Sequence, residues 1–144
     1  MKKIIFLIIL LFFLTSCNKD NSNPVITDGG LIGTWVLTNI SGTTSQGSVT
    51  ISPGLVGMSM TLVFNSDNTA SLLSVQQGQS TTQSFTWITL NGTIVFTPTT
   101  GGVIIVLPYT EVGNKINVGF TSILPSINYN GVIITSLILE FTKQ

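Results

Sequence analysis

Short runs in which apolar and polar residues alternate recur from residue 31 to the end of the chain. In the clearest run, residues 115–120, apolar side chains at the even positions alternate with polar residues or glycine at the odd ones. A period of two residues is typical of a β-strand with one buried face, and no stretch of this region keeps the period of 3.6 residues that an amphipathic helix needs. The pattern predicts an all-β domain.

Eight strands are expected from this pattern, each bounded by glycine, proline or residues with short polar side chains. Their ranges are 31–40, 58–64, 69–75, 83–90, 93–97, 103–112, 115–121 and 132–142. Two of the connections are long, at residues 41–57 and 122–131.

Three of the short connections carry turn signals. Residues 65–68 supply Asn, Ser and Asp side chains, which bond to their own backbone and tolerate positive φ. Asn91-Gly92 and Gly113-Asn114 are two-residue hairpin signals between apolar runs. These hairpins tie neighbouring strands together, so the predicted order is antiparallel and up-and-down.

The alternation also assigns side chains to faces of the sheet. Met58 and Met60 share one face of their strand, and Phe85 and Trp87 share one face of another. The strand expected at 103–112 is apolar on both faces. We therefore expect that strand to be buried on both sides or covered by the N-terminal tether.

Eight antiparallel strands form either a closed barrel or a β-sandwich. In a barrel the first strand, 31–40, pairs with the last strand, 132–142, or with its neighbour. In a sandwich the chain crosses between two sheets instead. We favour the eight-stranded up-and-down barrel and keep the sandwich as the alternative.

The first residues of the chain form a targeting segment rather than part of this domain. Lys2 and Lys3 precede an unbroken apolar run at 4–14, which is shorter than the about 20 residues that a transmembrane helix needs. Residues 14–17, Leu-Thr-Ser-Cys, resemble the lipobox of bacterial lipoproteins. The resemblance implies cleavage before Cys17 and acylation of its thiol and amino terminus, and two or three acyl chains make a stable membrane anchor.

The chain is therefore expected to have three parts. Residues 1–16 are the lipoprotein signal peptide, residues 17–30 are the lipidated cysteine and a polar tether, and residues 31–144 are one β domain with a single core. The lipobox implies a lipid-anchored protein of the bacterial outer membrane, which faces the periplasm or is displayed on the surface.

Several motifs of the domain resemble those of small bacterial lipocalin-like lipoproteins. Residues 33–35, Gly-Thr-Trp, resemble the Gly-x-Trp of the first strand, and 61–69 resemble the second hairpin. Residues 85–87, Phe-Thr-Trp, with the hairpin at 91–92, resemble the central tryptophan strand, and 139–143 resemble the last strand. The resemblance implies a lipocalin-like barrel over about 110 residues, in a family most of whose members have no known activity.

Two features of the ligand-carrying lipocalins are missing. The chain has no Thr-Asp-Tyr segment, and it has no arginine to stack beneath Trp35. The resemblance therefore implies the barrel rather than a particular ligand.

Charged residues make up only 7% of the chain, with five lysines, five acidic residues and no arginine or histidine. A nucleic-acid-binding protein needs a basic face to neutralise phosphates, so we expect no nucleic-acid partner.

The single cysteine is expected to carry lipid, which leaves no disulfide and no thiol nucleophile. Without histidine there is no base of the usual kind beside a nucleophile and no usual zinc or copper site. We expect neither enzyme activity nor a metal or other cofactor.

Aromatic and methionine side chains are the remaining candidates for a site. An eight-stranded barrel is wide enough either to be filled by side chains or to hold one small ligand. The number of large apolar residues favours a filled interior. If the barrel is instead a cup, the lining residues are expected to be Met58, Met60, Phe85 and Trp87, with Trp35 closing one end and residues 41–57 forming a lid.

No basic side chain lies on these candidate strands, so the expected ligand is a neutral apolar small molecule. The leading hypothesis is a non-catalytic, lipid-anchored protein that binds such a ligand or a partner protein. The alternative is a structural or adhesive β module with a filled core and no cavity.

Overall fold

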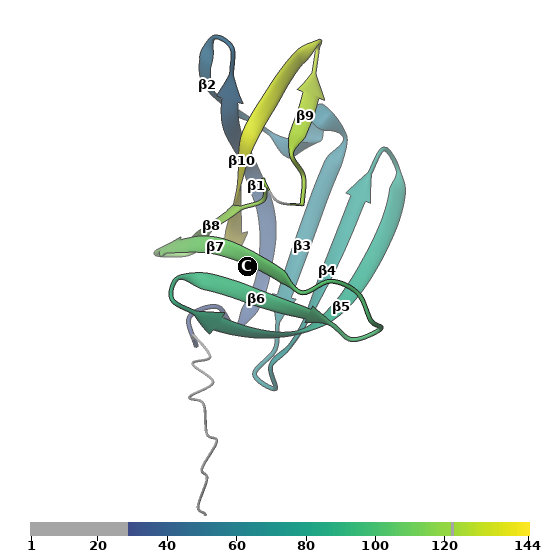
Figure 1. The fold of residues 1–144 in the computed structure, drawn as a ribbon, viewed down its shortest axis with the longest axis vertical. Coiled ribbons are helices and arrows are strands. Elements are labelled where there is room, and N and C mark those ends of the chain that lie inside the picture. Colours follow the sequence, from purple (N-terminus) through teal and green to yellow (C-terminus); the bar gives the residue numbers. More distant parts are fainter. Residues whose placement is uncertain (1–28, 122) are drawn as a thin grey trace, which may run out of the picture.

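Ten strands and one short 3-10 helix follow one another in the computed structural model, which describes residues 29–121 and 123–144 (Figure 1). The strands are β1 (Gly33–Thr44), β2 (Gly47–Ile51), β3 (Met58–Phe64), β4 (Thr69–Gln76), β5 (Gln79–Leu90), β6 (Thr93–Pro98), β7 (Ile105–Val112), β8 (Lys115–Gly119), β9 (Ser126–Tyr129) and β10 (Val132–Lys143). The helix is η1 (Pro53–Val56). The signal peptide, Cys17 and most of the tether lie outside the described residues.

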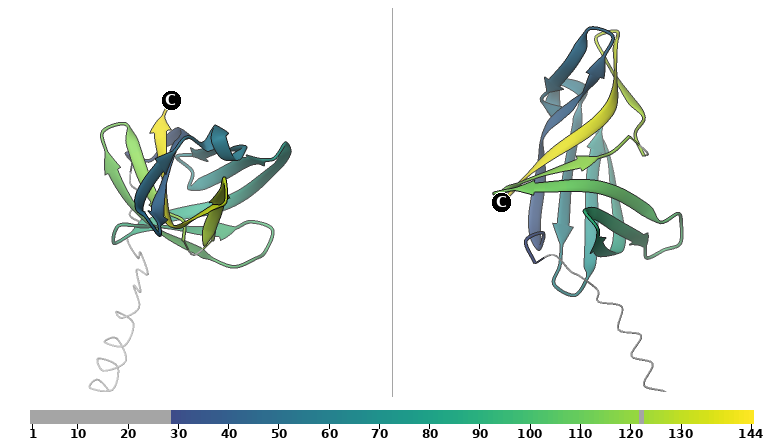
Figure 2. Two further views of the ribbon diagram at one scale, coloured as in Figure 1. Left: turned by 90° about the horizontal axis from the view of Figure 1, so that it is seen from above. Right: turned by 60° about the vertical axis from the view of Figure 1, so that its left-hand side comes forward.

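Eight of these strands close into a barrel in the order β1, β3, β4, β5, β6, β7, β8, β10, and β10 pairs back to β1 (Figure 2). Every pairing is antiparallel, and the closing pairing aligns Leu37 with Phe141. The predicted pairing of the first and last strands is thus confirmed. The fold is the eight-stranded up-and-down barrel, and the sandwich alternative is wrong.

The two long connections contain structure that the sequence pattern did not reveal. Residues 41–57 form the end of β1, the strand β2 and the helix η1, and residues 122–131 include β9. β2 pairs with residues 40–44 of β1, and β9 pairs with residues 132–135 of β10. These four strand segments form an arm that rises above the barrel in both figures. The sequence pattern identified these two connections only as long, because the arm gains its order from pairing with β1 and β10.

Two bulges accompany the change of neighbours along the closing strands. The β1–β10 register slips at Thr38 and again opposite Ser136, which has a φ of 52°. A bulge bends its strand and increases the local twist. β10 therefore pairs with β9 from Val132 to Thr135 and, beyond the bulge, with β8 from Ile138 to Thr142.

The predicted hairpin turns are present. Asn91 and Gly92 have φ values of 50° and 72°, as a type I′ turn requires. Gln77-Gly78 and Asn130-Gly131 have positive φ at both positions too, and they join β4 to β5 and β9 to β10. The strand bounds differ most at β1, which ends at Thr44 rather than at residue 40, and at β5, which begins at Gln79 rather than at residue 83.

The predicted facing of the strands is confirmed for most of the core. The inner faces of the strands and Leu31 supply a single cluster of buried apolar side chains. The expectation that the strand at 103–112 is buried on both faces is wrong. Val106 and Val112 on the outer face of β7 are 51% and 69% exposed. β7 is therefore buried on one side only. Among the described residues, no helix is long and apolar enough to cross a membrane.

Candidate functional site

Aromatic side chains fill the lower half of the barrel, near the β3–β4 turn. The Phe64 and Trp87 rings meet edge to face with centroids 4.8 Å apart, and Phe64 stacks on Phe96 at 5.8 Å. Phe85 lies against Phe96 at 5.2 Å. The indole Nε1 of Trp87 donates to the carbonyl oxygen of Asn65 at 3.4 Å. Aromatic pairs in these geometries pack favourably, so this part of the interior is filled by side chains.

Trp35 is fully buried, and the described chain enters the domain beside it. Its indole Nε1 donates to the carbonyl oxygen of Leu31 at 2.7 Å. Lys143, at the end of β10, places its Nζ 5.2 Å from the centre of the Trp35 ring and donates to the carbonyl oxygen of Gly30 at 2.7 Å. The lysine thus occupies the position over the ring for which the sequence offers no arginine.

The wall of the barrel opens where β5 loses one of its neighbours. β5 pairs with β4 from Gln79 to Thr86, but with β6 only from Phe85 onward, so residues 79–84 have β4 as their one neighbour in the sheet. Next to this point the backbone N–H of Thr99 donates to the carbonyl oxygen of Ser84, and the chain then leaves the sheet in the β6–β7 loop, residues 99–104. The pairing between β5 and β6 ends here because β6 is half as long as β5, with 6 residues against 12.

A groove of about 770 Å³ lies at this opening. It runs between the upper part of β5, the β6–β7 loop and Ile123. The lining residues are Thr82, Gln83, Ser84, Phe85, Pro98, Thr99, Thr100, Gly101, Gly102, Val103, Ile104, Ile105, Val106 and Ile123. Sites for small molecules occupy about 300–1,000 Å³, so the groove has the size of a ligand site.

A crevice of about 50 Å³ continues from the groove into the barrel. The groove and the crevice share four lining residues, Gln83, Phe85, Ile105 and Ile123. Beyond them the crevice is lined by apolar side chains of the core, including Leu62, Phe96 and Phe120. Among the described residues, the crevice is therefore a small space in the core that is entered through the side of the barrel.

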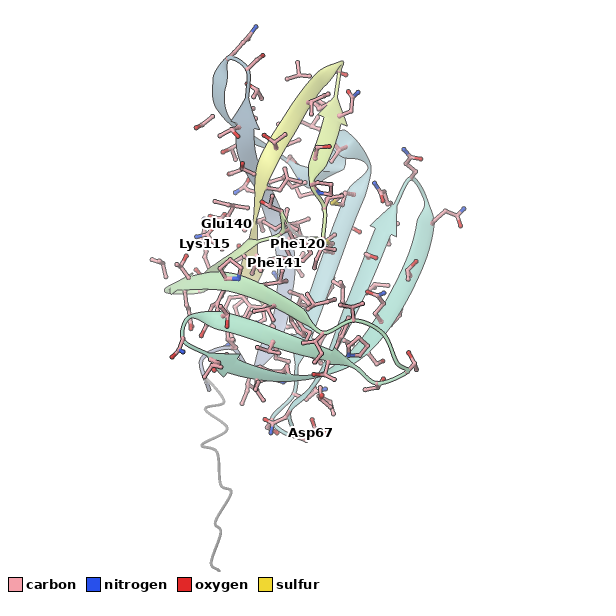
Figure 3. The ribbon with its side chains drawn as sticks, viewed as in Figure 1. Asp67, Lys115, Phe120, Glu140 and Phe141 are labelled. Atoms are coloured by element: carbon pink, nitrogen blue, oxygen red, sulfur yellow. The ribbon has the colours of Figure 1, made fainter. Side chains whose placement is uncertain are left out.

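The groove carries no charged side chain, since its polar atoms belong to threonine, serine, glutamine and the backbone. The charged groups that the structure describes lie elsewhere. Glu140 and Lys115 form an ion pair of 3.0 Å on the outer wall, and Asp67 lies at the lower turn, as Figure 3 shows. The groove can thus offer hydrogen bonds and apolar contacts, but no countercharge.

The carboxylates of Glu140 and Asp67 accept hydrogen bonds that stabilise the fold. Asn39 donates to the carboxylate of Glu140 at 2.7 Å, and this hydrogen bond, followed by the one from Lys115, lowers the pKa of Glu140. The hydroxyl and the backbone N–H of Thr69 donate to the carboxylate of Asp67 and lower its pKa. Nowhere in residues 29–121 and 123–144 do three or more acidic, histidine or cysteine side chains gather as metal ligands would.

The candidate residues from the sequence do not surround one cavity. Phe85 lines both the groove and the crevice, but Trp87 and Trp35 are buried in the filled lower half. Met58 and Met60 lie towards the other end of β3, and about 20 Å of extended backbone separates Met58 from Phe64, whose ring contacts Trp87. Cys17 is outside the described residues.

Sequence reasoning missed most of the residues that line the groove. Residues 103–106 carried one usable signal, the apolar run at 103–112 that alternation did not explain, whereas Ile123 lies outside that run. Gln83 gave none, because a lone glutamine on a strand is usually solvent-exposed surface.

Two family models match this chain, and one solved structure is similar to it. A family model of the lipocalin-like domain matches residues 31–122, and a model of the prokaryotic membrane lipoprotein lipid attachment site matches residues 1–18. No curated protein matches the sequence. Among solved structures, the lipoprotein YedD from Klebsiella pneumoniae is similar, with 14% identity and a TM-score of 0.46, over 83% of this chain and 75% of that one.

The match to the lipocalin-like model covers more than half of the chain, and the eight-stranded closure of β1 on β10 is the fold that this model implies. The attachment-site match includes Cys17, the residue that the lipobox pattern singled out. The chain therefore belongs to the lipocalin-like domain family and is a lipid-anchored membrane lipoprotein.

Proposed function

We propose that this lipoprotein is a non-catalytic binding protein of the bacterial outer membrane, and that it holds a small neutral apolar ligand in the side groove. The observation that carries the proposal is the continuity of groove and crevice through Gln83, Phe85, Ile105 and Ile123. A ligand can rest in the groove and insert one apolar group into the crevice. The crevice alone is too small for a ligand, since about 50 Å³ is close to the space that two waters take up in the liquid.

The lining supports a neutral ligand. Transfer of a charged group into a site without a countercharge costs several kcal/mol, whereas apolar surface gains about 25 cal/mol per Å² on burial. Gln83 and the hydroxyls of Thr82 and Ser84 suit a weakly polar group such as an ester, amide or hydroxyl. We therefore expect a carboxylate or sulfonate to be disfavoured.

The absence of catalysis is part of the proposal. Lipocalin-like lipoproteins are generally non-catalytic. The sequence has no histidine, and its single cysteine is the lipid attachment residue. Glu140 is held in a hydrogen-bonded ion pair, and Asp67 is engaged by Thr69 in a turn. Neither carboxylate reaches the groove.

A pair of fluorescent probes tests the proposal. N-phenylnaphthylamine and anilinonaphthalene sulfonate share their aromatic rings and differ in the anionic sulfonate. We expect saturable binding of the neutral probe to a soluble form of the chain, residues 18–144, which lacks Cys17 and its lipid and is checked for β structure by circular dichroism. The anionic probe should bind at least about tenfold more weakly, because its charge meets no partner.

Two variants locate the binding. Ile123→Ser removes an apolar side chain from both the groove and the crevice, and we expect it to weaken binding of the neutral probe about five- to tenfold. Ile138→Ser is the matched control, since both isoleucines are 45% exposed and Ile138 lies on β10 away from the groove. Equal binding by both variants and the parent would contradict the proposal.

The filled lower half favours a second candidate, a structural or adhesive module without a ligand. Phe64, Trp87 and Phe96 leave no space among them, as expected for a protein whose barrel serves only as a scaffold. Absence of saturable binding by either probe would support this candidate and a role carried by surface contacts with a partner protein.

A further inference from the structure

An apolar face covers the outside of the barrel over β5, β6 and β7. The register aligns Ile88 with Val95 and Val95 with Val106 in one row across the three strands. The next row joins Leu90 through Thr93 to Pro108, and Ile104 extends the face at the start of β7. We call the six residues Ile88, Leu90, Val95, Ile104, Val106 and Pro108 the outer apolar face.

This face is unusually exposed for an apolar surface. Leu90, Ile104 and Val106 expose 52%, 57% and 51% of their area. Ile88 is 37% exposed and Val95 is partly buried, so the six residues together expose a few hundred Å², the size at which apolar patches on soluble proteins mark interaction sites. The residues that flank it on the same side are threonines, such as Thr86 and Thr97, and none of the face residues is charged.

The lipid anchor limits which surfaces of the domain can reach the membrane. Cys17 is 12 residues before Gly29 (29 − 17), and a chain of that length spans about 40 Å at full extension. The described chain begins at the lower end of the molecule, at the level of β5 and β6 (Figures 1 and 2). The tip of the arm lies at the far end of β1, about 40 Å of strand away. The anchor therefore attaches at the end of the domain that carries the outer apolar face, and the tip of the arm lies at the opposite end.

We infer that the outer apolar face docks on the lipid surface to which Cys17 anchors the chain. An uncharged apolar surface with a rim of hydroxyls fits the boundary between headgroups and acyl chains, where apolar side chains bury about 5–10 Å deep. Charge plays no part in this docking, so bilayers of zwitterionic lipid suffice. The docked face also brings Ile104 and Val106, which line the groove, to the lipid.

The docking does not depend on the proposed ligand. It rests on the exposed face and the anchor, and the groove has its own test with soluble probes. If the probes fail to bind and the face still docks, only the proposed function is lost. If the probes bind and the face does not dock, only the present inference is lost.

Quenching by brominated lipid measures the docking. The mature lipidated protein is placed in phosphatidylcholine vesicles with and without dibrominated acyl chains, and the emission of Trp35 and Trp87 in the parent protein is subtracted. Ile104→Trp reports on the face, and Val106→Trp is a second reporter there. Ile133→Trp is the matched control, because Ile133 is 59% exposed against 57% for Ile104 and lies on the arm.

We expect bromine to quench Ile104→Trp and Val106→Trp at least about twofold more than Ile133→Trp. Equal quenching at the face and on the arm would mean that the domain tumbles freely on its tether and would overturn the inference. An emission shift at the face that grows with protein density, without bromine quenching, would mean that the face binds a second copy of the chain and would also overturn it.

Discussion

Lys143 lies over the buried ring of Trp35, with its Nζ 5.2 Å from the ring centre. The two residues face each other across the closing pair of strands, since Trp35 on β1 is aligned with Lys143 on β10. The ammonium also donates to the carbonyl oxygen of Gly30, so it binds the entering chain to the end of the last strand. The lower end of the barrel is therefore closed by a cation–π contact and a hydrogen bond.

Trp35→Ala should lower the free energy of unfolding by about 3–5 kcal/mol, because it leaves a large cavity in a packed core. Lys143→Met keeps the aliphatic stem and should cost only about 1–2 kcal/mol, the loss of the cation–π contact and of the hydrogen bond to Gly30. Urea denaturation of the two variants and the parent measures both values. A cost below about 1 kcal/mol for Trp35→Ala would mean that the ring is not a core element.

The close packing of β1 on β10 makes a second prediction. A Cβ added at Gly42 would lie 2.5 Å from the carbonyl oxygen of Thr135 and 2.6 Å from Cγ2 of Ile134. Gly42→Ala should therefore destabilise the protein by about 1–3 kcal/mol through overpacking. Gly54→Ala is the control, because a Cβ there meets only a serine hydroxyl at 4.0 Å. The midpoints of thermal unfolding of both variants measure this difference. Equal midpoints would contradict the close approach of β10 to Gly42.

Stability should depend on pH through Glu140. Its hydrogen bonds from Asn39 and Lys115 lower the folded-state pKa below the unfolded value, so the stabilisation is complete above the unfolded pKa of about 4.3. It is lost as the pH falls through the lowered folded-state pKa. Glu140→Gln should cost about 1 kcal/mol at pH 7 and progressively less in acid.

Denaturation of the parent and Glu140→Gln across this pH range measures the effect. The control is Glu111→Gln, at an exposed carboxylate on β7, which should change the free energy of unfolding less at neutral pH. A difference between parent and Glu140→Gln that does not shrink in acid would mean that the carboxylate charge is not responsible.

The anchor is tested by Cys17→Ser. A serine hydroxyl cannot take the place of the thiol in lipid attachment, so the full-length precursor should remain uncut and should incorporate no labelled fatty acid. The size of the protein on a gel measures cleavage of the signal peptide, and incorporation of the labelled fatty acid measures lipid attachment. Mature protein that still partitions with membranes would show that another residue provides the anchor.

Much of the barrel could be predicted from the sequence because local signals determine it. Alternation assigned Phe85 and Trp87 to the inner face, and Asn91-Gly92 supplied the positive φ values of a hairpin. The two ends of the barrel sheet, β1 and β10, were expected to pair, and they do.

The arm could not be predicted in the same way. Residues 41–44 and 47–50 are mostly serine, threonine and glycine, so these strands have no apolar face and show no alternation of apolar and polar residues. Their order comes from pairing with distant strands, for example Thr43 with Thr135. The groove could not be predicted for a similar reason. It exists because β6 stops opposite Phe85 and leaves residues 79–84 of β5 without a partner on that side.

The central claim is that apolar ligands enter through the side of the barrel rather than through its top. Methyl chemical shifts of the mature chain, followed during titration with N-phenylnaphthylamine, test it most directly. We predict shifts at Ile104, Ile105 and Ile123 and none at Ile133 on the arm. Shifts centred on Met58 and Met60, or no shift at Ile123, would contradict the account.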